Sequence, residues 1–480
     1  MAGFGNPTQA VYSTIRELVE NSLDSCDDAQ TYPLVDIEVR NLTSDIITVT
    51  VSDNGTGVPS EQVPQAFGRV LYGSKYSQLQ KRGTFGLGVT MAVLYGQITT
   101  DSPVIIHSRT QNSKGFLYRL LIDVENNLPL VEGKEELQRD TVGTTVTVHL
   151  KGDLKRSQDR IIDYLRLSTV STPHATLTLK IDNEVILNLG GWSKNIPEPI
   201  RPSEPHPRSV DMEVLRRLIS RHGEKNLNDF LCSSFQKIGS RTSARFLRFM
   251  NMNPNRIISE LNRDELSQLA HALRKYDGFE RPDSKCLSPI GKSDFLSAAS
   301  SSFNVKHVEY ASRGVSEWQG NPFVIEALLA TGDDFPRSDV PTLYRFVNRV
   351  PLLYDSSDDV LTRVLKSVNW SRYGVALSEP VALFLHLCST KIPFKAAGKQ
   401  SLASIPEIEH EAYQLFKELG RKLGKINTRS KRNVRETKKM REFSKSFRQI
   451  AKFSTALAGY DEVPSTDNLV KQLFEVEPDE

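Results

Sequence analysis

The sequence predicts an α+β protein of several domains, and three observations lead to this fold class. At 480 residues the chain is too long for one hydrophobic core, so two to four domains are expected. Residues 1 to about 195 alternate between helical and strand-like periodicity, whereas residues 211–276 are helical throughout. A second mixed region follows over residues 287–390, and a long helical pattern begins at about Ile408.

The first region combines one long amphipathic helix, predicted over residues 8–25, with several strands. Apolar and polar residues alternate in the segments VDIEVR, IITVTVSD, VIIHSRT, GFLYRLLIDV and TTVTVHL. Together with glycine-rich loops, these elements favour a sandwich in which helices cover one face of a sheet. A linker is predicted next, from the prolines that crowd into one stretch: Pro197, Pro199, Pro202, Pro205 and Pro207.

Composition excludes several other classes of protein. Hydrophobic residues make up 38% of the chain and charged residues 25%, which is ordinary for a globular protein. The four cysteines are scattered, which predicts neither a disulfide framework nor a zinc site and suits a reducing compartment. The sequence has no apolar run of membrane-spanning length and no signal peptide. A soluble, intracellular protein is therefore expected.

The net charge of +3 is unevenly distributed. Residues 417–448 contain 13 lysines and arginines against three glutamates, a local charge of +10, so the rest of the chain carries −7. Such asymmetry is typical of contact with nucleic acid or an acidic partner, although a solvated helix face would give the same pattern.

The first predicted helix places carboxylates and an amide on its polar side. At 100° per residue, the apolar residues gather on one side and Glu17, Glu20, Asn21 and Asp24 on the other. Glu17 and Asn21 project side by side, one turn apart, so a base can stand beside an oxygen that ligates Mg²⁺. The alternative is a helix face that is merely solvated.

Asp53 ends a predicted strand over residues 47–53 and falls on the apolar face of that strand. A carboxylate directed to the buried side needs hydrogen-bond donors, and the exocyclic amine of adenine is one that a ligand could supply. Gly55 and Gly57 follow in DNGTGVP and allow the chain to approach a ligand closely. The alternative is an ordinary turn after a strand.

Glycines also open a second predicted helix, in the series Gly83, Gly86 and Gly88 before VTMAVLYG. Backbone N–H groups at such a helix start can hold phosphates. The series is neither a dinucleotide fingerprint nor a Walker A loop, because no strand precedes it and no Lys-Ser/Thr pair follows it. Gly143 and Thr144, at the start of TTVTVHL, form a weaker fourth motif.

The order of these motifs resembles the GHKL ATPase superfamily. Glu-x-x-x-Asn, Asp-x-Gly-x-Gly, Gly-x-x-Gly-x-Gly and Gly-Thr all occur in that order within the first 150 residues. The blocks AGFGNPTQAVYSTIRELVENSLDS, VPQAFGRVLYGSKY, RGTFGLGV, VNWSRYG and HLCSTKIPFKAAGKQSLASIPEIE further resemble the family of topoisomerase VI B subunits, over nearly the whole chain.

This resemblance implies a domain order. A GHKL (Bergerat) ATP-binding α/β sandwich is expected over residues 1–200, and a helix-two-turn-helix domain over residues 211–285. An α/β transducer domain is expected over residues 286–425, and a basic C-terminal helix with an acidic tail over residues 426–480. In the helical domain, Lys237, Arg241 and Arg245 of FQKIGSRTSARFL, taken as a helix, a turn and a second helix, could contact a DNA backbone, or the domain could pack internally or bind protein.

The resemblance also implies roles for individual residues. Glu17 would be the general base that activates water, Asn21 would ligate Mg²⁺, and Asp53 would accept a hydrogen bond from the exocyclic amine of adenine. Lys399, which the residues alone would leave as a loop lysine, would reach the γ-phosphate of ATP and couple its state to domain rotation. The remaining nucleotide contacts would be Gly57, Ser74, Lys75, Gly83, Gly86, Leu87, Gly88, Val89 and Thr144.

The implied activity is that of the ATP-hydrolysing subunit of a type IIB DNA topoisomerase. ATP would close two B subunits around double-stranded DNA, while a separate A subunit would carry the strand-cleaving tyrosine; the Asp333-Asp334 pair is expected to form only a turn. The protein would work with DNA, in the nucleoid or the nucleus. The alternatives are a non-catalytic scaffold for a DNA-cleaving partner and another GHKL enzyme.

Two features depart from the family pattern. Relatives usually carry an N-terminal strap before the AGF block, which here follows Met1 directly, so ATP-gated dimerisation is expected to be weaker or differently built. Thr90 stands where archaeal relatives tend to have lysine, which removes a charge near the phosphates.

Overall fold

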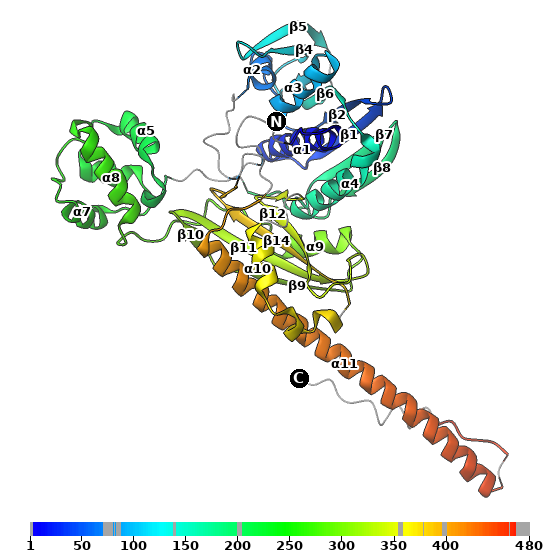
Figure 1. Cartoon of the computed structure of the whole chain (residues 1–480). Coiled ribbons are helices and arrows are strands. Elements are labelled where there is room, and N and C mark those ends of the chain that lie inside the picture. The colour runs from blue at the N-terminus through cyan, green and yellow to red at the C-terminus, as the bar shows by residue number, and fades with distance from the viewer. Residues whose placement is uncertain are drawn as a thin grey trace.

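The fold is that of a computed structural model, which consists of two α/β bodies, a helical body and one long helix (Figure 1). The described residues are 3–70, 80, 82, 88–137, 141–198, 204–353, 359–377, 379–395, 401–459 and 461–466. The predicted α+β organisation is confirmed. Among these residues no helix has both the length and the apolar character needed to cross a bilayer.

The N-terminal body contains an eight-stranded sheet in the order β5-β4-β3-β6-β2-β1-β7-β8. Its neighbouring strands are antiparallel except β1 and β7, which are parallel. The strands predicted by alternation are all present, whereas the sequence did not indicate β5, β7 and β8. The strands are β1 Leu34–Asn41, β2 Ile46–Ser52, β3 Val104–Arg109, β4 Gly115–Asp123, β5 Leu128–Leu137, β6 Gly143–Lys151, β7 Thr176–Ile181 and β8 Glu184–Gly190.

Helices cover one face of this sheet, as the alternation in β1 shows. Val35, Ile37 and Val39 are buried, while Asp36 and Arg40 between them are exposed. The first helix is longer than predicted, because Asn6 caps it by accepting a hydrogen bond from the Gln9 backbone N–H at 2.8 Å. The helices of this body are α1 Pro7–Asp28, α2 Val63–Gly68, α3 Gly88–Thr100 and α4 Leu154–Ser171.

The helical body has its own apolar core, centred on Phe230, Phe246 and Leu269. Its helices are α5 Met212–His222, α6 Leu227–Ser234, α7 Ser240–Phe249 and α8 Arg263–Lys275, with 3-10 turns at Pro207–Ser209 and Ile258–Glu260. The segment FQKIGSRTSARFL contains one helix, not two, because α6 ends at Ser234 and Lys237 lies in the turn with a positive φ of 55°. Lys237, Arg241 and Arg245 are all exposed.

The second α/β body has a six-stranded sheet in the order β10-β11-β14-β12-β13, with β9 paired to β11. YRFVNRVPLLY, expected to be strand-like, forms a hairpin, because Asn348 (φ 46°) and Arg349 (φ 68°) turn the chain between β12 and β13. The turn expected at Asp333 and Asp334 is confirmed. The elements are α9 Lys292–Ser302, β9 His307–Ser312, β10 Ser316–Trp318, β11 Asn321–Thr331, β12 Thr342–Val347, β13 Val350–Pro351, α10 Val360–Ser367, the 3-10 turns Trp370–Tyr373 and Val375–Leu377, and β14 Val381–Ser389.

The last helix, α11 Pro406–Leu457, is 52 residues long and begins two residues before its predicted start. Its first half packs on the second sheet through residues such as Ile408, Leu415 and Phe416, which are almost fully buried. Its second half projects away from the rest of the protein (Figure 1), and residues 428–443 are all exposed. The helix continues without a break past the expected domain boundary at residue 425.

Because Phe416 is completely buried beside Trp370, with ring centroids 6.3 Å apart, Phe416→Ala should lower the free energy of unfolding by about 3–5 kcal/mol. The control is Met440→Ala in the projecting half of the same helix, which should change it by about 0.5 kcal/mol at most. Denaturant-induced unfolding measures both, and equal effects would contradict the packing described for α11.

Candidate nucleotide-binding site

The polar face of α1 is buried, so the solvated-face alternative is wrong. Glu20 and Asp24 are 2% and 1% exposed, and the side chain of Glu17 is 13% exposed. The Arg16 guanidinium forms an ion pair with Glu17 and lies 3.5 Å from the carboxylate of Glu20. Burial alone would lower the pKa of Arg16, but the two glutamates raise it well above its usual value.

Glu17 and Asn21 occupy successive turns of α1, as predicted. The Asn21 side-chain N–H donates to the backbone carbonyl of Glu17 at 2.8 Å, which turns the amide oxygen away from that carbonyl. The Glu17 carboxylate lies against Gly88, the first residue of α3, where an added Cβ would stand 1.6 Å from Oε2. A larger residue at this position would displace the Glu17 carboxylate from the positive end of the α3 dipole.

The other residues predicted around the phosphates are partly outside the described structure. Ser74, Lys75, Gly83, Gly86, Leu87 and Lys399 fall in segments that are not described. Val89 lies in the first turn of α3 and packs against the apolar core. Thr90, which stands where archaeal relatives tend to have lysine, is 2% exposed in the same turn.

Asp53 directly follows β2 and is 8% exposed, as its place on the apolar face predicted. Its carboxylate accepts hydrogen bonds from the Ser22 hydroxyl at 3.0 Å, the Gly55 N–H at 2.9 Å and the Thr144 N–H at 3.2 Å. The donors come from α1, the loop after β2, and β6. An ordinary turn would supply only the Gly55 bond, so Asp53 is the point where three elements meet.

Thr144 is tied to Asp53 in both directions, because its carbonyl accepts the Asp53 backbone N–H at 2.9 Å. Gly143 before it has a φ of +133°, and a Cβ there would stand 2.0 Å from the carbonyl oxygen of Asp53. Gly57 lies further along the loop, with its Cα against the carbonyl of Arg109. The second and fourth motifs of the sequence are thus one structural unit.

Sequence reasoning missed Ser22, Ser108 and Arg16. Ser22 lies one turn after Leu18 on the buried side of α1, so its helical position was a signal that it could meet the buried end of β2. The Ser108 hydroxyl lies 3.2 Å from the Thr144 hydroxyl and accepts the Val58 N–H at 2.7 Å. Ser108 lies in β3, and no local pattern indicated that β3 pairs with the start of β6.

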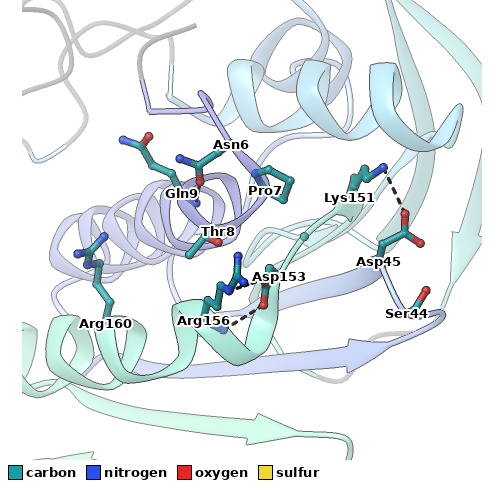
Figure 2. A pocket seen from close by; sticks show the side chains of 11 residues that line it. Asn6, Pro7, Thr8, Gln9, Ser44, Asp45, Lys151, Asp153, Arg156 and Arg160 are labelled. Carbon is teal, nitrogen blue, oxygen red and sulfur yellow. Dashed lines mark hydrogen bonds and ion pairs between the residues drawn. The ribbon is translucent and has the colours of Figure 1, made fainter.

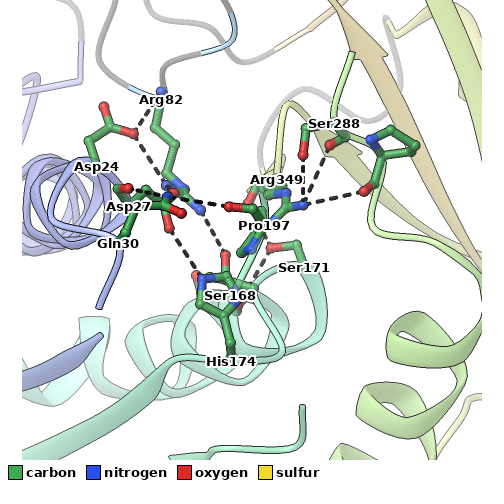
Figure 3. Close-up of polar contacts among 12 residues, drawn as sticks. Asp24, Asp27, Gln30, Arg82, Ser168, Ser171, His174, Pro197, Ser288 and Arg349 are labelled. Atoms are coloured by element: carbon green, nitrogen blue, oxygen red, sulfur yellow. Dashed lines mark hydrogen bonds and ion pairs between the residues drawn. The ribbon is translucent and has the colours of Figure 1, made fainter. Parts of the chain in front are cut away.

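A second cluster of charges surrounds the end of α1, shown in Figure 3. The buried Arg82 guanidinium lies 2.7 Å from Asp27 and 3.2 Å from Asp24, and it donates to the Thr172 hydroxyl at 3.0 Å. His174 lies 3.2 Å from the other oxygen of Asp27. Burial would raise the pKa of Asp27, but Arg82 and His174 lower it well below its ordinary value.

The second α/β body reaches the same cluster through the β12–β13 hairpin (Figure 3). The Ser171 hydroxyl, in α4, donates to the Arg349 carbonyl at 2.6 Å, and the Arg349 guanidinium donates to the Ser288 hydroxyl at 3.3 Å. Gln80 accepts the Ser288 N–H at 3.1 Å and donates to the Cys286 carbonyl at 3.0 Å. Gln80 therefore contacts the segment that leads into α9, whereas Arg82, two residues later, contacts α1 and the end of α4.

A separate depression of about 740 Å³ lies beside the N-terminal ends of α1 and α4, shown in Figure 2. Lys151 lies 3.3 Å from Asp45, and Arg156 lies 3.5 Å from Asp153, so cations and carboxylates offset one another there. None of the predicted nucleotide residues lines it, and it is assigned no ligand. Its lining is Asn6, Pro7, Thr8, Gln9, Ser44, Asp45, Lys151, Gly152, Asp153, Arg156 and Arg160.

Comparison with known proteins identifies the families that this chain resembles. The family model of histidine kinase-, DNA gyrase B- and HSP90-like ATPases matches residues 6–154, and that of the topoisomerase VI B subunit transducer matches residues 282–439. The chain is 35% identical over 459 residues to the B subunit of the type 2 DNA topoisomerase 6 of Metallosphaera sedula, covering 94% of this chain and 86% of that protein. The corresponding B subunits from Saccharolobus solfataricus and Pyrobaculum aerophilum are each 36% identical, covering 92% and 94% of this chain and 84% and 86% of their own.

The buried His174 generates a prediction about pH. Burial lowers the pKa of His174 despite the opposing effect of Asp27, so folding favours the neutral form of this imidazole. The unfolded chain takes up the proton near pH 6.5, so stability should fall as pH decreases through that value. His174→Gln should reduce the slope of unfolding free energy between pH 7 and 5 by up to about 1.4 kcal/mol per pH unit.

The matched control is His271→Gln, because His271 is exposed on α8. Chemical unfolding measured at several pH values in this range decides the matter. A His174→Gln variant with the wild-type slope would show that the imidazole is not kept neutral by its surroundings.

Proposed function

The chain belongs to the family of topoisomerase VI B subunits, and on that premise we propose that α1, the loop after β2 and the N-terminus of α3 hold ATP with Mg²⁺. It is the ATP-hydrolysing subunit of a type IIB DNA topoisomerase. The observation that supports the proposed site is a pair of contacts. The Glu17 carboxylate lies against Gly88, and the Asp53 carboxylate is held by hydrogen bonds from Ser22 and Thr144.

Asp53 is proposed to recognise the adenine base. Its three hydrogen bonds from protein groups fix the carboxylate in one orientation at the buried end of the site. A preorganised carboxylate accepts a hydrogen bond from an amine without first losing freedom of its own. The exocyclic amine of adenine is such a donor, whereas the carbonyl of guanine at the same position would face a negative charge.

Glu17 is proposed to act as the general base. A base must be within hydrogen-bond reach of the attacking water. The carboxylate of Glu17 extends from α1 to Gly88 at the start of α3, where backbone N–H groups attract phosphates. Arg16 supplies the counter-charge that a largely buried carboxylate requires. Glu17 would take a proton from water as the water oxygen bonds to the γ-phosphorus and the bond from that phosphorus to the β,γ-bridging oxygen breaks, which releases ADP.

Asn21 is proposed to ligate Mg²⁺ through its side-chain oxygen. Among the described residues there is no cluster of three or more His, Cys, Asp or Glu side chains that could hold a metal, so phosphate and water would provide the other ligands. Mg²⁺ commonly binds in this way, and it would offset the negative charge of the phosphates. Lys399 is proposed to contact the γ-phosphate from the transducer.

The proposed partners are an A subunit that cleaves DNA, a second B subunit and double-stranded DNA, so the protein would act where the cell keeps its DNA. The exposed half of α11 supports a contact with DNA, because residues 428–443 are all exposed and lie within the basic stretch of residues 417–448. Phosphate contacts of this kind are insensitive to sequence and weaken with salt.

Glu17→Ala should lower the ATP turnover of the complex with its A subunit and DNA by at least about 100-fold, because general-base catalysis contributes about 10²–10⁴-fold. Nucleotide binding should persist, since Asp53 and α3 are unchanged. Steady-state hydrolysis and binding of a non-hydrolysable ATP analogue measure the two properties.

The control is Glu184→Ala, which removes an exposed glutamate at the far edge of the same sheet and should leave turnover unchanged. Wild-type turnover in Glu17→Ala would overturn the assignment of the base. A wild-type complex without ATPase activity would favour the scaffold alternative instead.

Asp53→Asn should weaken ATP binding by about 10- to 100-fold, as expected for loss of a hydrogen bond to a charged group. The asparagine oxygen can still accept the Gly55 and Thr144 N–H groups, so the fold should be retained. Calorimetric titration with ATP and GTP tests this, because the preference for ATP should fall with the affinity. An unchanged preference would remove Asp53 from adenine recognition.

A further inference from the structure

A row of polar side chains crosses three neighbouring strands of the first sheet. Asp53 follows β2, Thr144 stands in β6 and Ser108 in β3, and the three residues are 8%, 5% and 2% exposed. Ser108 and Thr144 are directly opposite one another in the pairing of β3 with β6. The next pair on the same face, Ile106 and Val146, is apolar and belongs to the core. The polar row therefore lies where the apolar core ends.

The hydroxyl of Ser108 is fixed from one side by the loop after β2. The Val58 N–H donates to the Ser108 oxygen at 2.7 Å, so the proton of this hydroxyl points to another partner. Two acceptors are within its reach, the Thr144 hydroxyl oxygen at 3.2 Å and the Gly143 carbonyl at 3.4 Å. When Ser108 donates across the shorter of these contacts, the Thr144 hydroxyl keeps its own proton for a different acceptor.

Thr144 and Asp53 together form an edge that has a donor beside an acceptor. The Thr144 N–H donates to the Asp53 carboxylate at 3.2 Å, so the hydroxyl and the carboxylate belong to neighbouring residues of the sheet. The carboxylate only accepts hydrogen bonds, and the Thr144 hydroxyl donates when Ser108 donates to it. Adenine presents an amine donor beside the acceptor N1, which matches this edge. Guanine presents a carbonyl beside an N1–H donor, which opposes it at both positions.

We propose that Ser108 is a positioning residue for adenine recognition, which donates its proton to the Thr144 hydroxyl and so directs that hydroxyl as a donor toward N1 of the base. This inference rests on the proposed function, in which Asp53 accepts the hydrogen bond from the adenine amine. Ser108 does not need to touch the nucleotide. A threonine hydroxyl can donate or accept, and a fixed donor next to it removes this ambiguity.

The test compares ATP with 1-deaza-ATP, in which a C–H group replaces N1 and the amine stays in place. Each nucleotide, with Mg²⁺, competes at equilibrium with a fluorescent non-hydrolysable ATP analogue for the full chain in complex with its A subunit. The wild type should bind ATP about 3- to 10-fold more tightly than 1-deaza-ATP, as expected for one hydrogen bond between neutral groups. In Ser108→Ala this ratio should fall below about twofold, because only the binding of ATP is weakened.

The matched control is Ser52→Ala. Ser52 and Thr145 form a hydroxyl pair at 2.8 Å between β2 and β6, on the opposite face of the sheet, so the ratio should keep its wild-type value. Ser108→Thr keeps the hydroxyl and should also retain the ratio. Because Ser108→Ala removes the acceptor of the Val58 N–H, thermal unfolding of each variant is measured as well. Unfolded protein lowers the number of sites but does not alter a ratio of two dissociation constants.

A wild-type ratio in Ser108→Ala would overturn the inference, even if both nucleotides bound more weakly, because a purely structural role would have that effect. Thr144→Val should also abolish the preference for ATP over 1-deaza-ATP, and a fall in the ratio on adding Ser108→Ala to it would contradict the shared hydrogen bond. A wild-type protein that binds both nucleotides equally but prefers ATP to GTP would overturn the role of Ser108 and leave that of Asp53 intact. Equal binding of ATP and GTP would instead count against the proposed adenine site.

Discussion

The largely buried charges of α1 constrain the proposed nucleotide site and the segment that contains Arg82. Glu17, Glu20, Asp24 and Asp27 lie on this one helix, and a carboxylate taken out of water needs a partner. Arg16 compensates the first two from the helix itself. The other two depend on Arg82, which comes from the segment just before Gly83.

This dependence on Arg82 gives the helix a long-range requirement. The Arg82 guanidinium lies between Asp24, Asp27 and the Thr172 hydroxyl at the end of α4. Burial of the end of α1 depends on this positive charge, because it compensates the two carboxylates. The chain that leads into the glycine series is thereby fastened to the helix that carries Glu17.

Features with a local period could be predicted from the sequence, and those fixed by distant contacts could not. The alternation of β2 placed Asp53 on the buried side, and the helical period grouped Glu17 with Asn21, both in agreement with the structure. β5 was missed because it is largely exposed and so lacks alternation. Two of the groups that donate hydrogen bonds to Asp53, the Ser22 hydroxyl and the Thr144 N–H, lie 31 and 91 residues away in the sequence, and no periodicity links them to Asp53.

The hairpin of β12 and β13 shows how the two α/β bodies share a constraint. Arg345 on β12 forms a buried ion pair with Asp359, while the Arg349 guanidinium at the turn donates to the Ser288 hydroxyl and the Arg349 carbonyl accepts a hydrogen bond from the Ser171 hydroxyl. Backbone pairing of β12 with β14 makes this strand a stiff element, so its two ends cannot shift independently. The Arg349 turn therefore meets the end of α4 next to Thr172, which accepts a hydrogen bond from Arg82, so the second α/β body contacts the charged cluster at the end of the helix that carries Glu17.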